Sequence, residues 1–276
     1  MKVRTAGQAH QSRPEPPMPH AFEYFEFDPA PSLARHITSY WGFRVLVPDP
    51  PVHRIWPDGC IAIAAVSTPD QAYWTILGPR LGPLDVPVRA GASYWGARFW
   101  PDAGGAVLGM HAPELRDVTL VAPASLTNLI GHPPPALREG DQAAAADALD
   151  ALLRPLVERT RPLDDAVRHA VVAIVAARGA RPIAEIAAEI GIGERQLQRR
   201  FRAAVGLTPK QFARIRRLRA AGQTALAGTE PWAQVAATHG FADQSHLIHE
   251  FSQMTGLTPV AFEARLRQIG HGRLIS

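Results

Sequence analysis

The sequence predicts an α+β, multidomain fold in which a β-rich N-terminal domain precedes an all-α C-terminal domain with two helix-turn-helix units. Three observations support this prediction: the composition changes after Pro162 from strand-forming to helix-forming residues, one sequence block recurs 50 residues further on, and the positive charge gathers in the second part. The chain has 276 residues, of which 46% are hydrophobic. That is enough for buried cores in roughly two domains.

The first 130 residues indicate an arm followed by a sheet domain. Residues 1–20 are polar and contain four prolines, so we expect a disordered arm. Residues 21–130 are rich in Trp, Phe, Tyr, Val and Gly, in short runs between turn signals, which favours an antiparallel sandwich or barrel over a parallel sheet. The expected strands are Phe43–Val47, His53–Trp56, Ile61–Val66, Ala72–Leu77 and Ser93–Trp100.

Residues 131–162 are predicted to be a linker that contains one helix. Three consecutive prolines break the chain at residues 133–135, and the Ala- and Leu-rich segment Asp141–Leu156 indicates a linking or dimerising helix. We expect Pro155 and Pro162 to interrupt or end it, because proline lacks the backbone donor that a helix interior requires.

Residues 163–270 are predicted to be helical, and they contain the repeat; residues 271–276 form a short tail. The block Gly206–Phe212 recurs as Gly256–Phe262, and Leu197 and Phe201 recur as Leu247 and Phe251. A repeat of this length indicates two copies of one supersecondary unit.

Each copy has the pattern of a helix-turn-helix. In the first unit, at about 182–205, an apolar helix ends at Gly191, and a second helix buries Leu197 and Phe201 while its other face is polar and basic. The second unit, at about 230–255, repeats the pattern with Asp243 as the cap of its second helix. Thr208-Pro209 predicts the start of a linking helix that runs to about Leu226.

The charge is divided unevenly along the chain. The formal net charge is −2 up to Pro162 and +6 from Leu163 onward, which gives the overall +4. No carboxylate occurs between Arg195 and Arg219, where nine basic residues gather. Such a stretch favours a polyanionic partner, although a solvated helix face in an Arg-rich sequence explains the charge alone equally well.

The helical region, from about Asp164 to Arg267, resembles the paired helix-turn-helix domain of AraC/XylS-type transcription regulators. The resemblance covers both units, the linking helix and the second-unit signature Gly240–Leu247 with Phe251 and Gly256–Pro259. The N-terminal part resembles, more loosely, the cupin-like sensory domains that precede this domain in many members. The resembling segments are Ile37–Trp41, Trp56–Cys60, Gly78 and Gly96–Pro101.

The resemblance implies a sequence-specific DNA-binding regulator whose two recognition helices enter successive major grooves. The base-facing positions that it implies are Arg195, Gln198, Arg199, Gln244, Ser245, His246 and His249. Arg200 and Arg202 lie further round the helix, so we expect them to contact phosphates. Arginine can pair with guanine O6 and N7 through both arms of its guanidinium, and glutamine can pair with adenine N6 and N7.

The second unit departs from the usual pattern, because residues 243–255 contain no Lys or Arg. A neutral histidine at position 249 releases no counterions, so we expect the first unit to supply most of the electrostatic affinity. Gly193 also departs from the commoner Ser or Thr cap.

Two rival interpretations remain. An effector-independent DNA binder would use the N-terminal domain only for architecture or dimerisation. An enzyme is the less favoured rival, because the N-terminal histidines show no metal-ligand spacing and a single cysteine cannot supply thiolate zinc or repair chemistry. The residues weighed for it are His36, His53, His111, His132 and Cys60.

The remaining expectations concern ligands and location. We expect no metal and no cofactor; the partners are double-stranded DNA, a small-molecule effector, RNA polymerase and a second copy of the chain. The ligand pocket would be lined by Trp41, Trp56, Trp74, Trp95 and Trp100. No apolar run is long enough to span a bilayer and no export signal is visible, so we expect a cytoplasmic protein.

Overall fold

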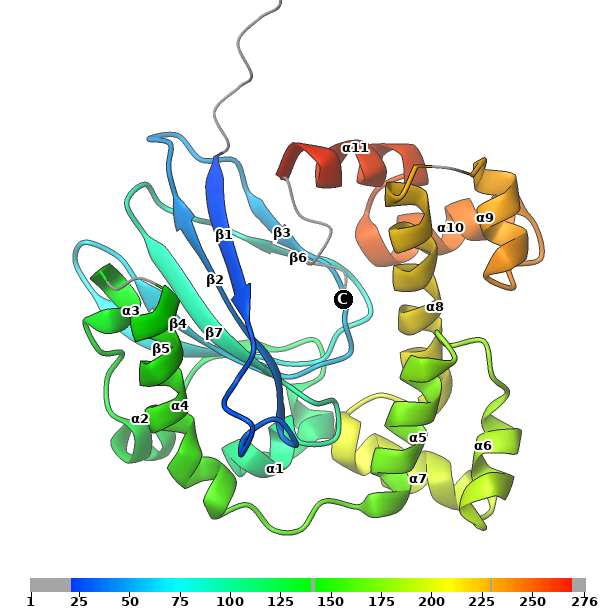
Figure 1. Ribbon diagram of the computed structural model, residues 1–276, viewed down its shortest axis with the longest axis horizontal. Helices are drawn as coiled ribbons and strands as arrows, with labels where there is room; N and C mark the ends of the chain where they lie inside the picture. Colours follow the sequence, from blue (N-terminus) through cyan, green and yellow to red (C-terminus); the bar gives the residue numbers. More distant parts are fainter. Residues whose placement is uncertain (1–20, 140–141, 229, 270–276) are drawn as a thin grey trace, which may run out of the picture.

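The computed structural model describes residues 21–139, 142–228 and 230–269, so the arm expected at residues 1–20 and the tail expected at 271–276 lie outside the described residues (Figure 1). The elements of the β domain and the helices packed on it are β1 (Phe22–Phe27), β2 (Ile37–Val45), β3 (His53–Ile55), β4 (Ala62–Ser67), β5 (Ala72–Leu77), β6 (Leu84–Val86), β7 (Ser93–Phe99), α1 (Gly104–Leu108), the 3-10 helix η1 (Ala112–Leu115), β8 (Thr119–Val121), α2 (Ala124–Ile130), α3 (Ala136–Glu139) and α4 (Gln142–Glu158). The elements of the helical domain are α5 (Asp165–Ala176), α6 (Ile183–Ile190), α7 (Glu194–Val205), α8 (Pro209–Leu226), α9 (Trp232–Thr238), α10 (Gln244–Thr255) and α11 (Pro259–Ile269).

The β domain is built on one six-stranded sheet with the order β1-β2-β7-β4-β5-β8 and a separate ribbon of β3 and β6. All paired neighbours are antiparallel, as the short strands and frequent turns predict. Each expected strand has a counterpart, whereas β1, β6 and β8 were not expected. The prediction of a β-rich domain followed by an all-α domain is confirmed.

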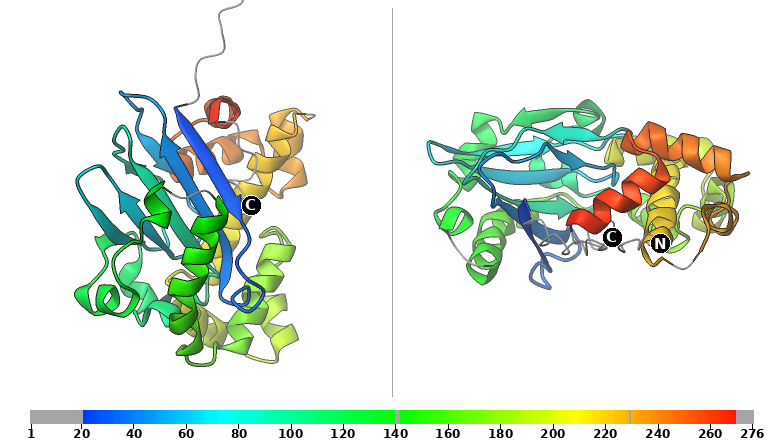
Figure 2. Two further views of the ribbon diagram at one scale, coloured as in Figure 1. Left: turned by 60° about the vertical axis from the view of Figure 1, so that its left-hand side comes forward. Right: turned by 90° about the horizontal axis from the view of Figure 1, so that it is seen from above.

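Helices α2 to α4 lie together beside the sheet (Figures 1 and 2). On α4, Leu149 and Leu153 are fully buried in the same core as the sheet residues, and the Tyr40 hydroxyl donates to Asp150 Oδ1 at 2.7 Å. The helix that the sequence suggests as a linker therefore packs on the β domain. Pro155 lies inside α4 instead of ending it, because the flanking Leu153 and Leu156 are buried and their packing outweighs one lost hydrogen bond.

The helical domain places its two helix-turn-helix units, α6–α7 and α9–α10, along the linking helix α8. Thr208 caps α8 with a reciprocal capping box: its hydroxyl accepts from the Gln211 amide at 3.2 Å, and the Gln211 side chain accepts from the Thr208 amide at 3.0 Å. The predicted stripes are buried in one apolar core, with Leu197, Phe201 and Leu247 fully shielded.

The two domains are joined by contacts between residues 56–59 of the β domain and helices α8 and α11. The turn at Gly59 leaves room for the Phe212 ring, since a Cβ on this glycine would lie 2.5 Å from Phe212 Cδ2. Arg219 is buried and donates to the Pro57 carbonyl at 3.1 Å. The Trp56 ring packs edge-on against Phe262 with centroids 4.8 Å apart.

A second set of contacts ties α5 to the β domain. Arg168 donates to the buried carboxylate of Asp102 at 2.8 Å, and its guanidinium lies 5.2 Å from the Trp100 ring. Burial raises the pKa of Asp102, although Arg168 and its hydrogen bond oppose that shift. The position of α5, and of the helices packed on it, is therefore set partly by the β domain.

Candidate nucleic-acid interface and cavity

The first recognition helix, α7, presents its arginines to solvent because its apolar side chains face the core. Leu197, Phe201 and Val205 are fully buried on one side. On the opposite side three arginines are exposed, and none forms an ion pair with any residue that the structure describes. These exposed residues are Arg195, Arg199 and Arg202.

Two other predicted contact residues of α7 have partners within the protein. Gln198 donates to Glu194 Oε1 at 2.9 Å, one helical turn earlier. Arg200 donates to both carboxylate oxygens of Asp164 at 2.7 and 2.6 Å. Asp164 also caps α5 through the amides of Ala166 and Val167, so Arg200 fastens α7 to α5.

The Asp164 carboxylate is held ionised by this arrangement. Burial alone would raise its pKa, but the hydrogen bonds from Arg200 and the helix amides keep the pKa of Asp164 below its ordinary value. Neither Glu194 nor Asp164 was singled out from the sequence. The only available signal was spacing, since Glu194 and Gln198 lie four residues apart.

The second recognition helix, α10, is polar and nearly uncharged on its exposed side. Gln244, Ser245 and His249 are exposed, and His249 lies 2.7 Å from the Gln253 amide nitrogen.

His246 is half-buried against the Phe241 ring, and its Nδ1 accepts from the Ala242 amide at 3.2 Å. His246 is thus held in place by its own turn.

The arginines of α8 point into the protein. Arg214 pairs with Glu250 of α10, Arg217 lies 5.0 Å above the Phe241 ring, and Arg219 reaches the β domain. The basic stretch seen in the sequence therefore separates into an exposed group on α7 and a group on α8 with partners inside the protein, where Arg214 and Arg217 contact the second unit and Arg219 contacts the β domain.

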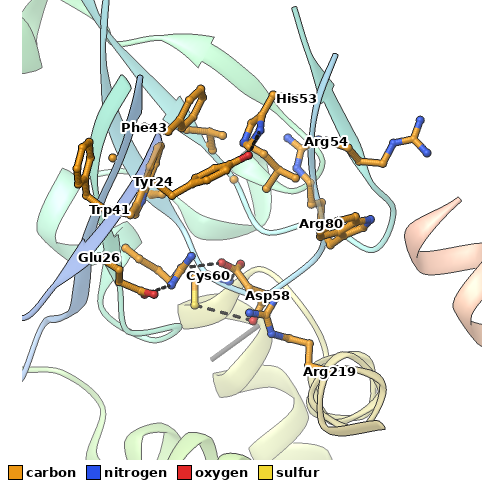
Figure 3. Close-up of a pocket in the computed structure, with 18 residues that line it drawn as sticks. Tyr24, Glu26, Trp41, Phe43, His53, Arg54, Asp58, Cys60, Arg80 and Arg219 are labelled. Carbon is orange, nitrogen blue, oxygen red and sulfur yellow. Dashed lines mark hydrogen bonds and ion pairs between the residues drawn. The ribbon is translucent and has the colours of Figure 1, made fainter. Parts of the chain in front are cut away.

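The β domain contains a cavity of about 100 Å³ beside α8 (Figure 3). Two of the five tryptophans predicted to line a pocket, Trp41 and Trp56, line this cavity, and Trp56 Nε1 is buried without a partner among the described residues. Trp74 and Trp95 are buried core residues. Trp100 donates to the Ala34 carbonyl at 3.0 Å and lines a second cavity, of about 520 Å³, which shares Asp58, Cys60 and Arg98 with the first.

The cavity wall combines aromatic rings with charged groups. His53 Nδ1 lies 3.1 Å from the Tyr24 hydroxyl, next to the Phe43 ring. Arg98 pairs with Asp58 at 2.9 Å and Glu26 at 3.2 Å. The lining side chains include four arginines and two carboxylates: Arg54, Arg80, Arg98, Arg219, Glu26 and Asp58.

Of the residues weighed for enzymatic chemistry, His53 and Cys60 line the same cavity, whereas His36 and His111 lie outside it. Burial raises the pKa of the Cys60 thiol to about 12, so this thiol is protonated at neutral pH. His111 is exposed beside Glu114, and His36 lies near Asp102 and Arg168. Within the described residues, no group of three or more His, Cys, Asp and Glu side chains could hold a metal ion.

Two family models match the chain. Residues 186–265 match a helix-turn-helix domain, and residues 25–121 match a domain of unknown function, DUF6597. The first match covers both helix-turn-helix units and the linking helix between them, and the protein is a DNA-binding transcription regulator. Its C-terminal domain is of the AraC type, and it follows a DUF6597 domain.

Among solved structures, the chain is similar to ToxT from Vibrio cholerae. ToxT from strain O395 is 10% identical, with 89% of this chain and 98% of that chain covered and a TM-score of 0.42. ToxT from strain SCE256 with an unsaturated fatty acid bound is 11% identical, with 88% and 94% covered and a TM-score of 0.41. These values are too low to bear on ligands. Among the described helices, none combines the length and apolar character needed to cross a membrane.

Proposed function

We propose that this regulator reads two successive major grooves on one face of DNA, with α7 in the first groove and α10 in the second. The observation that supports the proposal is the exposed, unpaired group of arginines on α7, opposite its buried stripe. In this proposal Arg195 and Arg199 read guanine, and Arg202 contacts a phosphate.

The linking helix suits this mode of binding. Its 18 residues span about 27 Å, and the recognition helices packed beside it extend further, which is compatible with grooves one turn or about 34 Å apart. Gln244, Ser245 and His249 would read the second groove. Gln198 must leave Glu194, and Arg200 must leave Asp164, before either contacts DNA.

Selection of binding sites from random DNA with the full chain tests this proposal. We expect a two-part site whose halves lie about 10 base pairs apart. Affinity for that site should fall by orders of magnitude between 50 and 200 mM salt if about six phosphates are contacted. Enrichment of no sequence, or affinity unaffected by salt, would contradict DNA reading.

We further propose that the β domain controls DNA binding through a small molecule in the cavity. Aromatic walls and an excess of arginine favour a planar, acidic ligand, and the buried Trp56 Nε1–H could donate to its acceptor group. Arg219 belongs to α8 and lines the cavity, so a ligand there would touch the linking helix directly.

Phenylacetate, phenylacetamide and phenethylamine form a size-matched set that separates charge from shape. We expect phenylacetate to raise the melting temperature of the full chain most, with a smaller shift in the Arg219→Gln variant. If none of the three shifts the melting temperature at millimolar concentration, the effector-independent alternative is favoured, in which the β domain only dimerises or braces the helices.

A further inference from the structure

The two recognition helices end at glycines that are equivalent in the repeat. Gly206 ends α7 and Gly256 ends α10, with φ angles of +80° and +70°. Only glycine adopts this left-handed conformation without strain, which is why it closes many helices.

Both of these glycines lie against the β domain. A Cβ on Gly206 would lie 2.6 Å from the Ala112 carbonyl oxygen and 3.0 Å from Pro79 Cγ. A Cβ on Gly256 would lie 3.1 Å from Arg54 Nη1 and 3.6 Å from Pro83 Cγ. Pro79 and Pro83 both belong to one short segment between β5 and β6, residues 78–83, which we call the brace loop.

The first helices of the two units provide the comparison. Gly191 and Gly240 lie between the helices of each unit, with φ of +77° and +70°, but a Cβ on either would meet nothing within 4 Å. Of these four glycines, only the two that end the recognition helices therefore lie against the β domain.

The brace loop is itself held firmly. Arg80 donates to the Val118 carbonyl at 3.0 Å and to the Thr119 hydroxyl at 2.8 Å, at the start of β8. The Leu81 amide donates to Asp117 Oδ1 at 3.2 Å, and the Leu81 side chain packs on the helical core. The loop thus has little freedom to follow a movement of either unit.

The contacts form a closed ring: the first unit joins α8, α8 joins the second unit, and the brace loop joins the second unit back to the first. The four steps from Pro79 to Pro83 span at most about 14 Å, so the two helix ends are kept close. A single helix bends and twists by itself, whereas a ring closed at a second point resists both movements.

We propose that the brace loop fixes the distance and the rotation between the two recognition helices, so that the β domain determines which half-site spacing the protein accepts. This inference rests on the proposed two-groove reading. One inserted base pair turns the second half-site by about 34–36° around the duplex. Following that turn would break the contact at Gly206 or at Gly256.

The experiment uses the full chain and its selected two-part site, with one base pair removed or one or two inserted between the halves. We expect the wild type to lose about tenfold or more in affinity for each altered spacing. Gly206→Ala should flatten this profile of affinity against spacing. The added Cβ would lie 2.6 Å from the Ala112 backbone oxygen, which cannot move aside easily, so the end of α7 would have to move away from the β domain. Gly256→Ala should flatten it less, because a Cβ there would come no closer than 3.1 Å to its nearest neighbour, Arg54 Nη1, against 2.6 Å to a backbone oxygen at position 206.

Gly191→Ala and Gly240→Ala are the matched controls, since they add the same backbone strain without touching the β domain. They should keep the sharp profile of the wild type. The double variant Pro79→Gly, Pro83→Gly loosens the brace loop without altering either unit, and it should flatten the profile even if Gly206→Ala fails to fold.

The outcomes separate the two proposals. If selection yields no two-part site, the two-groove reading fails, and the spacing role fails with it. If a two-part site is found but the wild type accepts every spacing, or the loop variant keeps the wild-type profile, the role of the brace loop alone is overturned.

Discussion

The two helix-turn-helix units share one architecture but differ in how they would hold DNA. The exposed side of α7 carries three arginines without ion-pair partners among the described residues, whereas α10 presents amide, hydroxyl and imidazole groups. The one carboxylate on α10, Glu250, is buried and paired with Arg214 of α8. We therefore expect phosphate attraction to come mainly from the first unit.

The units also differ in how their recognition helices begin. Asp243 caps α10 by accepting from the His246 amide at 2.7 Å, while Gly193 begins α7 without any side-chain cap. The first turn of α10 is therefore stabilised by a side-chain hydrogen bond, whereas no side chain caps the first turn of α7. Duplication of a unit therefore preserves its core and leaves its capping and its charge free to diverge.

Replacing one exposed residue in each unit should have the largest effect. At pH 8 we expect Arg199→Ala to weaken binding to the selected site by about 1–3 kcal/mol, with a shallower salt dependence. His249→Ala should cost less and leave the salt dependence unchanged, because a neutral imidazole releases no counterions. Affinity measured across a salt series checks both.

Arg199→Lys is the control for charge. It should retain most of the salt dependence while losing base discrimination, because lysine lacks the planar fork. Equal losses of affinity and equal changes in salt slope for Arg199→Ala and His249→Ala would show that both units contribute equally to the electrostatic part of DNA binding.

Removing the second unit's cap should have the next largest effect. Asp243→Ala leaves the His246 amide without its acceptor, so we expect a loss of about 1 kcal/mol in the free energy of unfolding. Asp243→Asn keeps an acceptor and should stay close to the wild type. Urea denaturation measures both, and a loss in the asparagine variant as large as in the alanine variant would contradict capping as the cause.

The sequence predicted the helical domain well because its signals are local or repeated. Apolar spacing and the caps at Thr208 and Asp243 depend on near neighbours, and the 50-residue repeat shows the same local pattern twice. The helices accordingly begin and end close to the expected residues. The packing of α4 on the sheet could not be predicted, because an amphipathic helix does not identify the surface that covers it.

Charge was the least predictive signal for the interface. The arginines of α7 and those of α8 look alike in sequence, yet Arg219 is buried against the β domain while Arg199 is exposed. The partner of Arg200, Asp164, lies 36 residues away, and that of Arg219, Pro57, lies 162 residues away. Contacts at such separations depend on the tertiary structure, which residue spacing does not encode.

Lowering the pH should destabilise the second unit more than the first, by a smaller amount than removal of the cap. Burial, with help from the nearby charge of Arg178 and against that of Glu230, lowers the pKa of His239, whose Nε2 lies 2.8 Å from the Thr224 hydroxyl. The stabilisation from neutral His239 is present above the ordinary histidine value, about 6.5, and is lost as the pH falls through the lowered pKa.

Helix α7 contains no histidine, whereas Glu189 of α6 lies 2.7 Å from His169 Nε2, so α7 is the better reference. Hydrogen exchange corrected for the intrinsic rate should therefore show protection in α9 falling below about pH 6.5, while protection in α7 changes little. The His239→Gln variant should remove the difference. An equal fall in α7 and α9 would assign the effect to the whole domain instead.

The smallest expected effect comes from giving the first unit the cap that the second already has. Gly193 has φ of −67° and ψ of 145°, an extended conformation open to any residue, and a Cβ there would meet nothing within 4 Å. Gly193→Ser should therefore raise the free energy of unfolding by a few tenths of a kcal/mol, because glycine is only slightly poorer than serine at this position. Gly193→Ala, which adds the Cβ without the hydroxyl, is the control in the same urea denaturation. A gain in the alanine variant equal to that of the serine variant would show that the benefit comes from restricting the unfolded chain, and that α7 does not lack a cap in any way that matters for its stability.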